Sequence, residues 1–270
     1  MGRDKKEPMP GWLLERAFFE AAPERVAPQL LGKLLVHKTR SGLVAGRIVE
    51  VEAYLGPHND VADAAAHSHR GPTPRNRVLF GPAGHAYVYS IYGRYFCMNV
   101  TCEKEGRAGC VLVRALEPVA GLKQMARNRG LIGALQEKNN RRSRDSVPLA
   151  RDLAMDDKRR LNPQEFTECG AAARELTSGP SRLCQALGLK RETHNGLDLL
   201  DPAAPLQVRD DGMRVTRVLV TRRIGIRNAV ELPLRFALPG HSCVSGPKNA
   251  VGKTIVLRAG SAGKLKPIKA

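Results

Sequence analysis

The segment Gly46-Arg47-Ile48-Val49-Glu50-Val51-Glu52-Ala53-Tyr54 decides the fold predicted for this chain. Its side chains alternate in character with a period of two, which is typical of a strand whose two faces have different surroundings. One face carries Val49, Val51 and Ala53, which we assign to the core. The other carries Ile48, Glu50, Glu52 and Tyr54. One interpretation is that both glutamates face water. The other is that Glu52, beside Tyr54, forms the floor of a pocket, where a partly desolvated carboxylate can act as a general base.

The 270 residues include five tyrosines, and these are clustered. One is Tyr54, and the other four lie in the segment His85-Ala86-Tyr87-Val88-Tyr89-Ser90-Ile91-Tyr92-Gly93-Arg94-Tyr95. Such clustering indicates a surface on which flat molecules stack, since stacking on an aromatic ring contributes ~1–3 kcal/mol per nucleic-acid base. We expect Tyr89 to be a stacking plate and Tyr92, just before a glycine, to be a protruding wedge. The alternative is that these rings only cover the sheet, because aromatic residues fit pleated surfaces.

The charge of the chain indicates a polyanionic partner. It has 44 Lys and Arg against 26 Asp and Glu, a formal net charge of +18, so affinity for nucleic acid should fall steeply with salt. A basic tail on an unrelated enzyme is the alternative explanation, but arginines also recur throughout the body of the chain. Neither an apolar run of about 18 residues nor a basic amphipathic helix is present, so we expect no membrane partner. The N-terminus lacks a signal peptide, which predicts a bacterial cytoplasm (nucleoid) or a eukaryotic nucleus.

Strand-like segments and few long helices predict one mixed α+β domain at residues 12–244, with a curved, largely antiparallel sheet and surrounding helices. Residues 33–38 and 43–54 are expected to pair as a hairpin. Helices are expected from about residue 118 and at 178–187, the second capped by Ser178 or Ser181. Charge runs with few large apolar residues predict a surface insertion at 128–174. Residues 1–11 and 245–270 are expected to be disordered tails.

A metal site would have to use Asp63, His67 and His69, of which the first two lie four residues apart. The spacing matches no known class of metal site, so we predict neither metal nor other cofactor and keep a metal-dependent hydrolase as an alternative. We interpret His67 instead as a flat lid opposite Tyr54. The six cysteines form no CxxC pair, which favours buried thiols in a reducing compartment.

Seven segments in order resemble the alkyladenine (3-methyladenine) DNA glycosylase family. They are GRIVEVEAYLGP (46–57), AHS (66–68), TPRNR (73–77), YVYSIYGRYFCMN (87–99), CVLVRALEP (110–118), SGPSRLCQAL (178–187) and PLRF (233–236). The resemblance implies that Glu52 activates the water that attacks the sugar C1′. It further implies that Tyr54, His67 and Tyr89 enclose a flipped base and that Tyr92 fills the gap left in the duplex.

The resemblance also implies a pocket wall in which Asn99 disfavours the exocyclic amine of normal guanine and Arg114 helps to hold the water. The other implied substrate contacts are Ala65, Leu112 and Ile224. The implied phosphate contacts are Arg75, Ser181 and Arg182. The insertion at 128–174 and the turn between residues 101 and 109 are longer than the family pattern, and we expect the insertion to add non-specific DNA contacts.

Together these observations predict a monomeric base-excision-repair enzyme acting on double-stranded DNA with alkylated or deaminated purines. Because no lysine lies beside Glu52 to form a Schiff base, we expect a monofunctional hydrolase that leaves an abasic site. A non-catalytic nucleic-acid-binding protein on a similar fold remains the second hypothesis. Glu52 in its aromatic setting discriminates between the two, since binding alone does not need it.

Overall fold

The computed structural model describes residues 9–131, 170–246 and 252–257. Most of the predicted insertion, and parts of both predicted tails, lie outside these residues. The strands are β1 Trp12–Leu13, β2 Leu34–Thr39, β3 Gly42–Tyr54, β4 Ala86–Ile91, β5 Tyr95–Thr101, β6 Cys110–Ala120, β7 Leu206–Asp210, β8 Arg217–Thr221, β9 Arg235–Ala237 and β10 Lys253–Val256. The helices are α1 Pro23–Leu30, α2 Leu122–Asn128, α4 Gly170–Thr177, α5 Pro180–Leu187 and α6 Arg191–His194, with 3-10 turns at Arg16–Phe18 and Arg77–Phe80.

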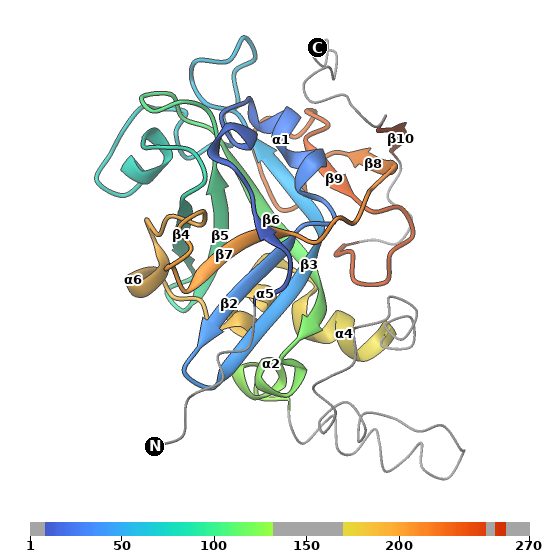
Figure 1. Cartoon of the computed structure of the whole chain (residues 1–270). Coiled ribbons are helices and arrows are strands. Elements are labelled where there is room, and N and C mark those ends of the chain that lie inside the picture. Colours follow the sequence, from blue (N-terminus) through green and yellow to red (C-terminus); the bar gives the residue numbers. More distant parts are fainter. Residues whose placement is uncertain (1–8, 132–169, 247–251, 258–270) are drawn as a thin grey trace.

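The strands form one curled sheet around β3, with the helices packed about it (Figure 1). The order β1-β7-β2-β3-β6-β5-β4 is extended by β9, which pairs with β3, and by β8 and β10 beyond it. Every strand pairing in the described ranges is antiparallel. The predicted α+β fold with a curved antiparallel sheet is confirmed, as is the β2–β3 hairpin.

The central strand β3 changes partners along its length. Its first half pairs with β2, its second half pairs with β9 through Glu52 and Arg235, and β6 follows its other edge throughout. At the change of partner the pairing with β6 shifts register on both sides of Glu50, a bulge that twists the strand locally. Glu50 and Glu52 are both fully buried, which excludes the interpretation that these glutamates face water.

The core is built from alternate strand residues and one face of each main helix. Helix α1 contributes Val26, Ala27 and Leu30, which lie on one face because of their helical spacing. Helix α2 begins later than predicted, because Pro118 is still part of β6. The capping prediction for α5 is wrong: Gly179 is the N-cap residue and no side chain caps the helix. No helix in the described part of the chain is both long and apolar enough to cross a membrane.

The predicted domain boundaries are too narrow at both ends. Arg209 donates hydrogen bonds to the carbonyls of Pro10 and Gly11, so ordered chain begins before residue 12. At the other end Ser245 is buried, and β10 pairs with β8. The assignment of residues 245–270 to a disordered tail is therefore wrong for 245–246 and 252–257. The many lysines of this segment hid two features that order it: β10 pairs with β8, and Ile255 and Leu257 pack against the core.

Candidate active site

Strand pairing places the candidate site residues in one row across the sheet. Glu52 on β3 lies opposite Leu112 on β6, Leu112 lies opposite Asn99 on β5, and Asn99 lies opposite Tyr87 on β4. Residues directly opposite one another on antiparallel strands project to the same face. Four segments that are far apart in the sequence thus deliver side chains to one surface.

This face holds a cavity of about 430 Å³, within the usual size range for small-molecule sites. Its lining residues are Tyr54, Ala65, His67, Tyr87, Tyr89, Ile91, Tyr92, Cys97, Asn99, Cys110, Leu112, Arg114, Pro180, Ile224, Gly225 and Ile226. The structure therefore brings together all the predicted substrate-binding residues. Sequence analysis had not assigned a site role to Tyr87, Cys97 or Cys110, although Tyr87 precedes Tyr89 by two residues and so shares its face.

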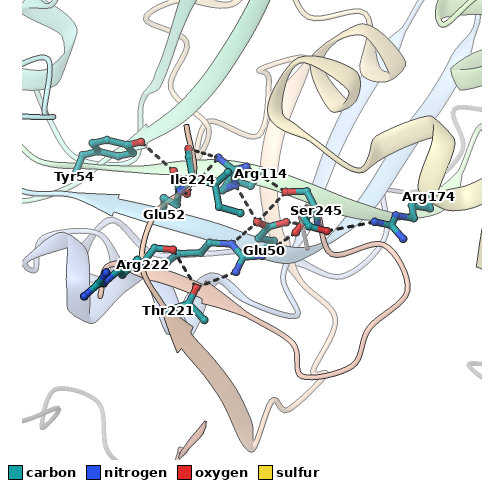
Figure 2. A network of polar contacts seen from close by, with 11 residues as sticks. Glu50, Glu52, Tyr54, Arg114, Arg174, Thr221, Arg222, Ile224 and Ser245 are labelled. Carbon is teal, nitrogen blue, oxygen red and sulfur yellow. Dashed lines mark hydrogen bonds and ion pairs between the residues drawn. The ribbon is translucent and has the colours of Figure 1, made fainter. Parts of the chain in front are cut away.

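Glu52 does not itself line the cavity but lies directly beneath its wall. Its Oε2 accepts a hydrogen bond from the Tyr54 hydroxyl at 3.0 Å, and its Oε1 accepts one from the Ile224 amide at 2.8 Å. The Arg114 Nη1 lies 3.2 Å from Oε1. All three partners border the cavity, and Figure 2 shows them converging on the carboxylate. Burial, followed by the charge of Glu52, raises the pKa of Tyr54, so its hydroxyl stays protonated as a donor.

A second buried carboxylate, Glu50, anchors a network next to Glu52 (Figure 2). Its Oε1 lies 2.9 Å from Arg114 Nε and 2.7 Å from Arg235 Nε. The Ser245 amide donates to Glu50 Oε2 at 2.6 Å, and the Ser245 hydroxyl donates to Glu50 Oε1 at 2.9 Å. The pKa of Arg114 is raised despite its burial, because Glu52 and then Glu50 stabilise the charged form. Such ions tolerate burial only when paired, so this network is a rigid base for the site.

One wall of the cavity consists of three rings in contact. The centroids of His67 and Tyr89 are 4.5 Å apart, and those of Tyr87 and Tyr89 are 5.4 Å apart. His67 Nδ1 lies 3.0 Å from the Tyr87 hydroxyl. Because His67 and Tyr89 touch, a base has no room between these two rings. Burial, then the charge of Arg75, lowers the pKa of His67, and burial raises that of Tyr87 to about 12.

Tyr54 is supported from behind by a buried ion pair. The Arg223 guanidinium lies 4.6 Å from the centroid of the Tyr54 ring, a cation–π contact. The same guanidinium binds both oxygens of Asp63, at 2.7 and 2.8 Å. Asp63 also accepts hydrogen bonds from the amides of Leu55 and Ala65. The carboxylate considered for a metal site is thus committed to Arg223, and no group of metal-binding side chains occurs within the described ranges.

Tyr92 occupies the tip of the β4–β5 hairpin at the cavity rim. Its side chain is 89% exposed, and its φ of 49° is unusual for a residue other than glycine. Gly93, with φ of 71°, completes the turn. Strained, exposed aromatic residues of this kind occur at functional sites.

The three predicted phosphate contacts lie around the same rim. Arg75 is exposed, and its charge acts on His67 and Tyr87. Arg182 is exposed on the first turn of α5, next to the half-buried Ser181. The preceding residue, Pro180, lines the cavity. Arg75 and Arg182 thus place two exposed cationic side chains beside residues that line the cavity.

Comparison with known proteins agrees with this geometry. The profile of the methylpurine-DNA glycosylase family matches residues 17–242. A relative from Koribacter versatilis is 42% identical over 235 residues, covering 87% of this chain and 94% of the relative. One from Methanoculleus marisnigri is 43% identical over 236 residues, covering 86% and 98%. One from Burkholderia cenocepacia is 40% identical over 240 residues, covering 88% and 94%. All three are named as candidate 3-methyladenine DNA glycosylases. The chain belongs to the methylpurine-DNA glycosylase family.

Proposed function

We propose that this protein is a monofunctional DNA glycosylase of base-excision repair. It takes an alkylated or deaminated purine out of double-stranded DNA into the 430 Å³ cavity. A water activated by Glu52 then attacks the sugar C1′, the N-glycosidic bond breaks, and an abasic site remains. It acts as a monomer on duplex DNA, with Arg75, Ser181 and Arg182 at the phosphate backbone.

The observation that carries this proposal is the setting of Glu52 beneath the aromatic cavity. An ionised carboxylate has about four acceptor positions, and three of them are taken by Tyr54, Ile224 and Arg114. On Oε2 only the Tyr54 hydroxyl is a partner among the described residues. We assign the remaining position to a proton of the attacking water, which would reach Glu52 from the cavity side, where its three partners lie. Pure DNA binding needs no such acid.

The cavity wall favours electron-poor purines. Alkylated purines carry positive charge, which the faces of Tyr54 and Tyr89 attract through cation–π interactions. The lowered pKa of His67 keeps its ring neutral near pH 7, so the third ring does not repel a cationic base. A base enters between Tyr54 on one side and the touching His67 and Tyr89 rings on the other.

Asn99 is held in a fixed orientation that suits discrimination against guanine. Its Nδ2 donates to the Tyr87 carbonyl at 3.3 Å, and its Oδ1 lies 3.6 Å from the Cys110 thiol. The amide is buried and cannot turn freely to accommodate an extra exocyclic amine. No lysine is among the described residues that line the cavity, which supports hydrolysis rather than Schiff-base chemistry.

Product analysis tests this function. The purified protein is incubated with duplexes that each carry one defined lesion, at one salt concentration and with EDTA present. We expect free purine and an equal amount of abasic site, with strand breakage only after alkali treatment. Tight binding without release of any base would instead establish the non-catalytic alternative. Loss of release in EDTA would establish metal-dependent hydrolysis.

A further inference from the structure

Ser245 belongs to the polar network of this site but lies beyond the predicted domain, which ends at residue 244. It also lies beyond the family match, which ends at residue 242. It is buried beside the two glutamates of β3, on the segment that follows β9. Every polar atom of Ser245 is engaged in the network of Figure 2. Its amide and hydroxyl donate to Glu50, and its carbonyl accepts from Arg235 at 2.9 Å.

The hydroxyl of Ser245 has a defined role toward each of its two partners, as a donor to one and an acceptor for the other. It donates its only proton to Glu50 Oε1 at 2.9 Å, so it faces Arg114 with a lone pair. Arg114 Nη2 donates to this lone pair at 3.2 Å. The hydroxyl therefore bridges the carboxylate that anchors the network and the guanidinium that reaches the cavity.

Arg114 is oriented by contacts in three directions. Its Nε faces Glu50 at 2.9 Å, its Nη1 faces Glu52 at 3.2 Å, and its Nη2 faces Ser245. The Nη1 atom also lies 3.4 Å from the Ile224 carbonyl, while the Ile224 amide binds Glu52. Removing the acceptor for Nη2 would leave a buried donor without its partner and would release the guanidinium to turn away from Glu52.

We propose that Ser245 is a positioning residue for base release: its hydroxyl holds Arg114 in the orientation that faces Glu52 and the cavity. This inference rests on the proposed function. Ser245 acts through Arg114, because it is not among the residues that line the cavity. The C-terminal segment is thus part of the catalytic apparatus and not an appendage to it.

The test compares Ser245→Ala with wild type and with the matched control Ser242→Ala. Ser242 is exposed on the same segment, and among the described residues its hydroxyl has a single polar contact, at 4.0 Å with the Cys243 thiol. Single-turnover base release and affinity for the same lesion duplex are measured for each protein. We expect Ser245→Ala to slow release roughly 10- to 100-fold at unchanged affinity, from the loss of one buried hydrogen-bond partner. Ser242→Ala should match wild type.

Rescue by a conservative variant separates positioning from simple destabilisation. Ser245→Thr keeps the hydroxyl that Arg114 Nη2 faces, so it should release the base at a rate close to that of wild type. Ser245→Ala should stay slow even where urea denaturation shows that it is as stable as Ser245→Thr. Release by Ser245→Ala within twofold of wild type, or release by Ser245→Thr as slow as that by Ser245→Ala, overturns the inference. Absence of release by wild type would instead contradict the proposed function.

Discussion

The floor of the cavity and the hairpin tip at its rim differ in almost every physical respect. Glu50 and Glu52 lie beneath the cavity lining, and we call these two residues and their partners the floor; both carboxylates are fully buried and held by multiple hydrogen bonds and ion pairs. At the tip, Tyr92 is exposed and its backbone is strained. Under the proposed function, the difference teaches that one molecule separates two tasks: a buried, multiply bonded carboxylate would break the glycosidic bond, and an exposed aromatic side chain would open the duplex. Substitutions in the two regions should therefore change different measured quantities.

The largest effect on stability is expected from Glu50→Ala. This change leaves the guanidinium groups of Arg114 and Arg235 buried without their shared partner. Breaking a buried ion pair from one side costs about 3–5 kcal/mol, which urea denaturation will measure. Asp211→Ala removes a more exposed partner, 2.8 Å from Arg47, and should cost at most about 1 kcal/mol. Equal losses in both variants would show that the floor is not a cooperative network.

A smaller effect, on affinity only, is expected from Tyr92→Ser. Loss of the exposed ring removes stacking of about 1–3 kcal/mol, so binding to a lesion duplex should weaken roughly tenfold or more while binding to intact DNA changes little. Gel-shift or anisotropy titrations at one salt concentration measure both affinities. Tyr92→Phe, which keeps the ring, is the matched control and should bind like wild type. An equal loss for lesion and intact DNA would rule out Tyr92 as the wedge.

The smallest effect concerns the pH dependence of binding and the cavity-wall residue His67. Its pKa lies below the usual 6.5, so the ring is neutral at pH 7 and becomes cationic only as the pH falls through that lowered value. The protonated ring then repels a cationic purine by about 1 kcal/mol, the Coulomb energy of two charges ~4 Å apart in water. Affinity for a 7-methylguanine duplex should therefore fall about fivefold on acidification, and affinity for a neutral lesion should change less.

Substitution of His67 by phenylalanine provides the control for this pH effect. The variant keeps an aromatic ring in the cavity wall but cannot take up a proton, so its ratio of affinities for cationic and neutral lesions should not depend on pH. If this ratio of affinities is also constant between pH 7.5 and 5.5 for the wild-type protein, His67 does not contact the base.

The same contrast explains how much of the site could be predicted from sequence. Alternation within β3 and β4 is a local property of the chain, so it was enough to place Glu52 with Tyr54 on one face and to single out Tyr89. Burial of a charged side chain instead depends on distant partners. Glu50 meets Ser245 across 195 residues of sequence, and no local pattern predicts that contact. The bulge at Glu50 and the Arg223–Asp63 pair behind Tyr54 have the same origin in long-range pairing.

The separation of the two tasks is tested most directly by Glu52→Gln on one lesion duplex. The amide keeps the size of the side chain and can still accept the hydrogen bond from Ile224, but it cannot take a proton from water. Single-turnover release should fall by at least ~100-fold, the lower range for loss of a general base, while lesion affinity stays within about threefold of wild type. Release within threefold of wild type would contradict the assignment of the chemistry to the cavity floor.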